Sequence, residues 1–231
     1  MNSTYLILVV GIMLFSWLIS YRLKSKFKKY SQVPMNKGIT GKDVAEKMLR
    51  SNGINDVQVV SVEGTLTDHY NPATKTVNLS RDVYYGNHIA AGAVAAHECG
   101  HAVQHAEAYS WLTLRTALVP IQNVSATIMN TIFMVMIFGS YFIHGMFPFM
   151  LPVIILCYGV FTLFAFITLP VEINASSRAL VWLNSAGITS YETQPMAQDA
   201  LRSAAYTYVV AALGSLAMLL YWIMIYLGRR N

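Results

Sequence analysis

The sequence has little charge. Only 12% of its 231 residues are Asp, Glu, Lys or Arg, about half of the roughly 25% that is usual in a soluble domain. Charge is missing altogether from residues 1–21, from the 56 residues between Arg115 and Glu172, and from the 26 between Arg202 and Arg229. This scarcity excludes a disordered chain or a nucleic-acid-binding protein, and two cysteines are too few for a small disulfide scaffold.

The uncharged runs are long enough to cross a membrane. One crossing of about 30 Å takes roughly 20 helical residues, so the first and last runs supply one span each and the middle run two. We expect the middle run to turn near Gly139-Ser140 and His144-Gly145. The predicted fold is a mostly α membrane protein with about four transmembrane helices, at 4–21, 118–139, 147–169 and 206–227. The water-exposed parts are then 22–115 and a helical segment at 170–205, and 118–169 forms a transmembrane hairpin.

Positive charge follows the first span directly. Five Lys and Arg residues lie within 22–29 and no charge precedes the span, which places the N-terminus outside and residues 22–115 in the cytoplasm. A secretory signal peptide has its positive region before the apolar core, so we expect this segment to be a retained anchor. Arg229 and Arg230 would then lie outside, but two terminal arginines are a weaker signal than five clustered basic residues.

The segment 22–115 has the patterns of a small α+β domain. Thr40 and Asp43 predict the start of a helix that ends at Gly53. Strands are predicted at 57–62, 64–69 and 76–79, and an alanine-rich helix at 89–109. Because Cys99 lies on that helix and Cys157 in a span, we expect no structural disulfide.

The alanine-rich helix carries the pattern HExxH, from His97 through Glu98 to His101. Residues four apart lie on one helical face, so both imidazoles can reach a single Zn²⁺ at about 2.0–2.1 Å. The carboxylate of Glu98 beside them can take a proton from water at the metal. The pattern therefore predicts one zinc ion with Glu98 as general base.

A third ligand has to come from elsewhere. His105 lies about 12 Å along the helix axis from His97, too far for one metal ion, and is better explained as a polar residue on the same face. Glu172 is the first charge after the long uncharged run, and a two-span hairpin returns it to the side of the membrane that carries His101. We predict Glu172 as the ligand, leaving an open fourth position as in catalytic sites. The alternative is an interfacial ion pair between Glu172 and Arg178.

Four stretches resemble the YugP-type membrane zinc metallopeptidases of bacteria: GTLTDHYNP at 64–72, VNLS at 77–80, AAHECGHAVQ at 95–104 and EINASSRA at 172–179. The resemblance implies a multi-pass plasma-membrane peptidase with a zincin-like domain, zinc held by His97, His101 and Glu172, and Glu98 as base. In the broader class with a glutamate ligand, an Asp often stands four residues after it. This chain has Ser176 there, so Asn174 and Ser176 are the candidates to orient a histidine.

We therefore expect a zinc-dependent metalloendopeptidase, in which Glu98 accepts a proton from zinc-activated water and returns it to the leaving amine. Arg178, His69 and Tyr70 are candidates to stabilise the oxyanion. An extended peptide is expected to bind along a strand edge, which we place at 76–79.

Two other functional classes compete with this interpretation. Intramembrane proteases combine HExxH with a later Asp-Gly segment, but no Asp lies between Asp82 and Asp199 and none is followed by Gly, so this class is rejected. The remaining alternative is a non-peptidase membrane scaffold or chaperone-like protein with a structural or vestigial zinc site, which the intact Glu98 disfavours. The expected partners are the lipid bilayer and a peptide or membrane-protein substrate near the headgroups, with no nucleic acid. The sequence does not fix the oligomeric state.

Overall fold

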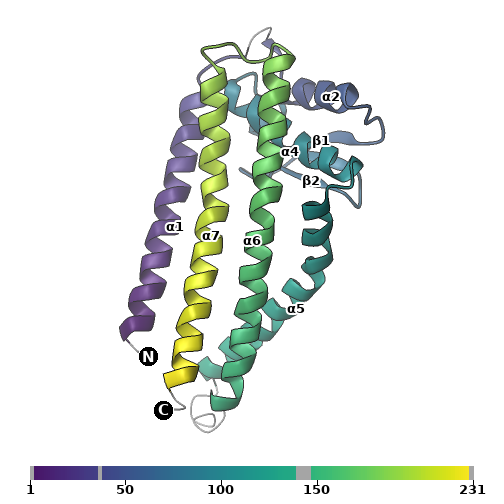
Figure 1. Cartoon of the computed structure of the whole chain (residues 1–231). Coiled ribbons are helices and arrows are strands. Elements are labelled where there is room, and N and C mark those ends of the chain that lie inside the picture. Colours follow the sequence, from purple (N-terminus) through teal and green to yellow (C-terminus); the bar gives the residue numbers. More distant parts are fainter. Residues whose placement is uncertain (1–2, 36–37, 139–146, 229–231) are drawn as a thin grey trace. The chain divides into compact units, whose positions relative to one another are not determined.

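The computed structural model describes residues 3–35, 38–138 and 147–228. More than half of the chain lies in four long helices (Figure 1): α1 (Ser3–Tyr30), α5 (Ser110–Phe138), α6 (Phe147–Ser185) and α7 (Gln194–Gly228). Each is long and apolar enough to cross a membrane, which confirms the predicted mostly α membrane fold. The turn predicted near Gly139-Ser140 and His144-Gly145, and the terminal Arg229 and Arg230, lie outside the described residues.

Three of these helices are much longer than the spans predicted from hydropathy. α1 continues to Tyr30, α6 to Ser185, and α7 begins at Gln194. Hydropathy marks only the apolar part of a helix, whereas helical hydrogen bonding continues into the polar residues beyond it. The polar ends of the long helices can therefore contribute to the water-exposed domain.

Residue contacts divide the chain into two compact units, and each long helix has one part in each. The first unit comprises the described residues of Met1–Trp17, Leu114–Leu169 and Tyr208–Asn231, and the second comprises those of Leu18–Thr113 and Pro170–Thr207.

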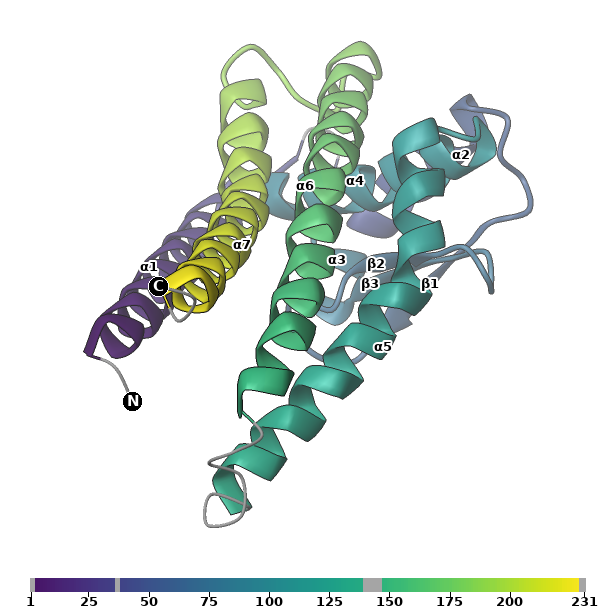
Figure 2. The same cartoon turned by 60° about the horizontal axis from the view of Figure 1, so that its bottom comes forward.

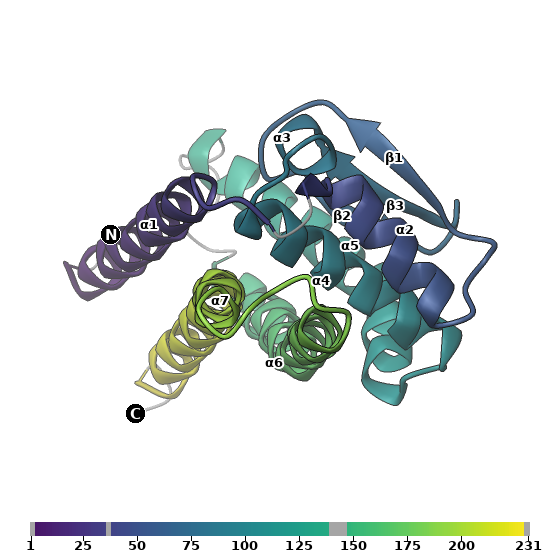
Figure 3. The ribbon, with the colours of Figure 1, turned by 90° about the horizontal axis from the view of Figure 1, so that it is seen from above.

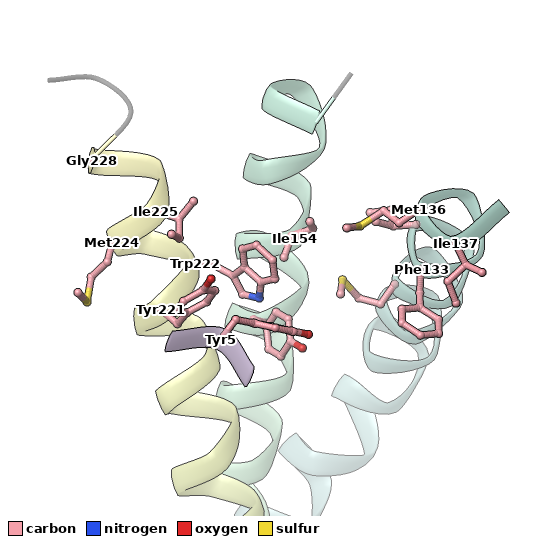
Figure 4. Close-up of a pocket in the computed structure, with 13 residues that line it drawn as sticks. Tyr5, Phe133, Met136, Ile137, Ile154, Tyr221, Trp222, Met224, Ile225 and Gly228 are labelled. Carbon is pink, nitrogen blue, oxygen red and sulfur yellow. The ribbon is translucent and has the colours of Figure 1, made fainter. Parts of the chain in front are cut away.

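The first unit consists of the apolar parts of the four long helices, seen from a second direction in Figure 2. α1 and α7 approach closely in it, since a Cβ on Gly214 would lie 3.2 Å from Ile12 Cγ2. The Tyr5 ring lies 5.4 Å from that of Tyr221 and 5.7 Å from that of Trp222, beside an apolar cavity of about 860 Å³ (Figure 4). The large exposed apolar side chains of the first unit fit a surface that faces lipid.

The second unit contains the small sheet, in the order β1-β3-β2 (Figure 3). Its strands are β1 (Gln58–Val62), β2 (His69–Asn71) and β3 (Thr76–Ser80). β1 is parallel to β3 and β2 is antiparallel to it. The helices α2 (Gly41–Ser51), α3 (Arg81–Tyr84) and α4 (Ile89–Ala106) complete this unit together with the polar ends of the long helices.

Two strand predictions are wrong. The segment 64–69 is not a strand, because Gly64 and Leu66 have φ angles of +105° and +59°, outside the extended region, and the strand begins only at His69. The segment 76–79 is a strand but not an edge. It forms the centre of the sheet, where Val77 and Leu79 are fully buried, and the edge strands are β1 and β2.

The core of the second unit lies where α2, β3 and α4 meet. Val44 and Met48 of α2 are buried there with Val77 and Leu79 of β3 and with the small side chains of α4. The predicted start of α2 is confirmed, because Thr40 and Asp43 form a reciprocal capping box. Because it packs against α2 and the sheet in this core, α4 is buried along most of its length.

Candidate metal centre

Helix α4 is rich in alanine and glycine because its neighbours come close to its backbone. Its N-terminus is capped by the His88 side chain, whose Nδ1 accepts a hydrogen bond from the Ala91 backbone N–H at 3.1 Å. At Gly100, a Cβ would lie only 2.6 Å from the carbonyl oxygen of Ala175 in α6. Within the second unit, α4 and the Pro170–Ser185 part of α6 are therefore nearly in backbone contact.

This contact brings together the three predicted metal ligands. Glu172 Oε2 lies 3.3 Å from His97 Nε2 and 3.6 Å from His101 Nε2, and one ligand atom from each of the three residues lies within 4.8 Å of the others. In a tetrahedral zinc site with bonds of about 2.0–2.2 Å, neighbouring ligand atoms are about 3.3–3.6 Å apart. The donor set and the two distances from Glu172 to the histidines therefore fit a zinc ion.

The three side chains are largely withdrawn from water. Glu172 is 3% exposed and His101 9%. Burial alone would lower the pKa of His101, but its hydrogen bond to Glu172 and the charges of Glu98 and Glu172 raise that pKa. A buried carboxylate is costly unless a cation or hydrogen-bond donors compensate it, so this arrangement favours a cation between the three groups.

Glu98 lies on the side of α4 that faces the sheet. Its carboxylate Oε2 accepts a hydrogen bond from the backbone N–H of Tyr70, in the edge strand β2, at 3.1 Å. The Tyr70 hydroxyl in turn lies 2.8 Å from Nδ1 of His105, which is not part of the metal-ligand group. The exposed His69 has Nδ1 2.8 Å from the Thr67 carbonyl oxygen. The structure thus places Glu98 against an edge strand.

One of the residues after Glu172 in α6 contacts a histidine of the metal-ligand group. Ser176 Oγ lies 3.1 Å from His97 Nδ1, where the broader class would have an Asp. Asn174 instead accepts a hydrogen bond from Arg178 Nε at 2.7 Å. Arg178, considered above as a partner of Glu172 or an oxyanion donor, forms an ion pair with Glu107 at 2.7 Å. Of the two candidates to orient a histidine, Ser176 therefore contacts one directly.

Gln104 is the residue that sequence reasoning missed. Its Oε1 lies 3.0 Å from His101 Nδ1, and its Nε2 donates to the Val171 carbonyl oxygen at 2.8 Å and to Asn174 Oδ1 at 2.9 Å. The only signal in the sequence was its spacing, three residues after His101 on the same helical face. A glutamine at that spacing is ordinary on any helix, so the sequence alone did not distinguish it.

Comparison with known proteins places these features in a family. The family model described as "Putative neutral zinc metallopeptidase" matches residues 5–227. Over 228 residues the chain is 41% identical to the "Putative membrane protease YugP" of Bacillus subtilis (strain 168), and the alignment covers 98% of each chain. No solved structure was found to match. The relative and the four apolar helices together support a membrane location.

Proposed function

The chain belongs to the YugP-type membrane zinc metallopeptidase family, and from this premise we propose that it is a membrane-embedded zinc endopeptidase. The observation that carries the proposal is the convergence of His97 Nε2, His101 Nε2 and Glu172 Oε2, with a further carboxylate, Glu98, on the same helix. Two imidazoles and one carboxylate leave a fourth tetrahedral position open for water and substrate, as in catalytic zinc sites.

The chain's own residues divide the chemistry between them. His97, His101 and Glu172 would hold the ion, and bound zinc lowers the pKa of water and polarises the scissile carbonyl. Glu98 acts as general base. Its Oε2 accepts the Tyr70 N–H, which holds the carboxylate in place while the group takes up the proton and later delivers it to the leaving amine.

The substrate approaches from the sheet. β2 is an edge strand, and its Tyr70 N–H is hydrogen-bonded to the proposed base. An extended peptide that pairs with an exposed strand edge gains main-chain hydrogen bonds whatever its side chains are. A peptide held along β2 would therefore have its backbone close to Glu98, which replaces our sequence-based choice of 76–79.

We also propose that the active site faces the cytoplasm and takes membrane-proximal segments of proteins. The five basic residues at 22–29 support this side, and Glu172 follows the predicted end of a span, at 169, by three residues. An impermeant thiol reagent should fail to label a cysteine placed at Lys42 in intact cells; labelling would contradict the orientation.

One cleavable sequence should be cut faster beside a transmembrane helix than as a free peptide, and equal rates would contradict membrane-proximal selection.

The decisive experiment compares the purified protein with its Glu98→Gln variant. The amide cannot accept the proton, so peptide cleavage should fall about 100-fold or more while zinc stays bound. Removal of zinc with a chelator should abolish cleavage, and added zinc should restore it. If the zinc-loaded protein cleaves no peptide, or if the variant cleaves as fast as the wild type, the scaffold or chaperone-like alternative with a structural or vestigial zinc is favoured.

A further inference from the structure

A hydrogen-bond network of four polar side chains runs from the surface to Nδ1 of His101. The exposed carboxylate of Glu107 pairs with Arg178 Nη2 at 2.7 Å, and Arg178 Nε donates to Asn174 Oδ1 at 2.7 Å. The same oxygen accepts from Gln104 Nε2 at 2.9 Å, and Gln104 Oε1 lies 3.0 Å from His101 Nδ1. Gln104 itself is fully buried. The network links two elements, α4 and α6, within the second unit.

Donor and acceptor chemistry fixes the direction of every hydrogen bond in this network. A guanidinium only donates, so the Asn174 atom that faces Arg178 must be the oxygen. The Val171 carbonyl only accepts, so the Gln104 atom that faces it must be the amide nitrogen. The remaining Gln104 atom, the oxygen, faces His101 Nδ1. His101 Nδ1 must therefore carry a proton, and Nε2 is the nitrogen left for a metal.

Gln104 also holds the backbone next to another proposed ligand. Its Nε2 donates to the carbonyl of Val171, the residue immediately before Glu172, at 2.8 Å. One amide group thus fixes the ring of His101 on one side and the helical turn that carries Glu172 on the other. No such lock exists on His97 in the described contacts, because the Ser176 hydroxyl can either donate or accept.

We propose that Gln104 is the positioning residue of the metal centre, and that Asn174 and Arg178 hold its amide in the required orientation. The proposal rests on the proposed function, in which His97, His101 and Glu172 bind zinc. Residues that orient metal ligands typically contribute about 10- to 100-fold to metal affinity. Gln104 therefore acts on zinc through His101 and Glu172, without contact to the substrate.

The test measures zinc affinity of the full chain in detergent by competition with a chromogenic chelator, and the visible spectrum of the cobalt-substituted protein. Gln104→Met should lower zinc affinity about 10- to 100-fold and alter the cobalt spectrum. The matched control is Gln194→Met, because Gln194 Nε2 also donates to an α6 carbonyl, that of Leu180 at 3.0 Å, away from the centre. This control should lose stability without losing zinc affinity.

A second pair keeps the test independent of folding defects at Gln104. Asn174→Asp retains an oxygen that accepts from both Arg178 and Gln104, so it should bind zinc within about threefold of the wild type. Asn174→Leu removes that oxygen and should lower the affinity more than Asn174→Asp does. Equal zinc affinities for these two variants, or for Gln104→Met and the wild type, would overturn the proposal.

His101→Ala separates failure of this inference from failure of the proposed function. If His101→Ala keeps full zinc affinity, the metal centre itself is wrong and so is the role of Gln104. If His101→Ala loses zinc while Gln104→Met and Asn174→Leu keep it, only the positioning role is overturned. Loss of zinc in all three, with both controls intact, supports the two proposals together.

Discussion

Helix α4 meets α6 and the sheet in different ways. On the α6 side, the contacts include the two histidines of the proposed metal site against Glu172, a glutamine bonded to the Val171 carbonyl, and backbone in near contact at Gly100. On the sheet side, the Tyr70 backbone N–H donates to Glu98, and the Tyr70 hydroxyl is hydrogen-bonded to His105 Nδ1. The α6 side therefore carries the proposed metal ligands, and the sheet side holds the proposed base. Metal binding and catalysis should be separable by mutation.

The largest effect is expected from a ligand on the α6 side. Glu172→Ala removes one of three ligand atoms, so zinc affinity should fall by more than the about 10- to 100-fold that an orienting partner contributes. The matched change on the sheet side is His105→Ala, which should leave zinc content unchanged. Zinc analysis of both purified variants checks the pair. Full zinc retention in Glu172→Ala would remove Glu172 from the metal centre.

Moving α4 and α6 apart without changing a proposed ligand should have the next largest effect on zinc affinity. Gly100→Ala would place a Cβ 2.6 Å from the Ala175 carbonyl, so the helices must separate, at about 1–3 kcal/mol in stability and about tenfold or more in zinc affinity. Gly92→Ala is the control on the same helix. Its Cβ would meet the sulfur of the flexible Met35 side chain, which can move away. Similar zinc affinities for both variants would show that helix spacing does not set the centre.

A smaller effect is expected at the hydroxyl that faces His97. Ser176→Ala removes the partner of His97 Nδ1, but His97 is less buried than Gln104, so water can replace the hydroxyl. Zinc affinity should fall only about two- to tenfold, less than in Gln104→Met. A loss larger than that of Gln104→Met would reverse the order that we assign to the two histidines.

The smallest effect on zinc is expected at Asp68, which ties the start of β2 to the end of β3. It accepts hydrogen bonds from the backbone N–H of Ser80 at 2.7 Å and from its hydroxyl, and burial raises the pKa of Asp68. The stability that its proton provides is present below the ordinary pKa of Asp and lost as pH rises through the raised one. Asp68→Asn should therefore be relatively more stable near neutral pH, with the difference shrinking toward pH 4, and should bind zinc normally.

Denaturant unfolding of the wild type and Asp68→Asn across this pH range checks the sign of the effect. A stability difference that grows toward low pH would contradict the cause that we assign to the pKa of Asp68. Reduced zinc affinity in Asp68→Asn would contradict the separation of the sheet side from the metal geometry.

The parts of the fold that sequence could predict are those with local or periodic signals. Uncharged runs predicted the four long helices, and Thr40 with Asp43 predicted the start of α2. Glu172 followed from topology, because a hairpin must return to its side of the membrane. Backbone conformation at Gly64 and Leu66, and the central position of β3, depend on how strands meet in space, so they were predicted wrongly. The role of Gln104 depends on which amide atom faces which neighbour, and no sequence pattern encodes that.

The near contact at Gly100 has a consequence for how the HExxH motif is used to recognise metal-binding proteins. HExxH specifies nothing at its third and fourth positions, yet here the fourth position fixes how closely a second helix can bring its glutamate. Two chains with the same histidines and the same distant glutamate could therefore differ in whether they bind metal, through one side chain that is not a ligand. A search for functional relatives should ask for the smallest residue at that position, and a bulky one there would mark a chain whose motif survives without its metal.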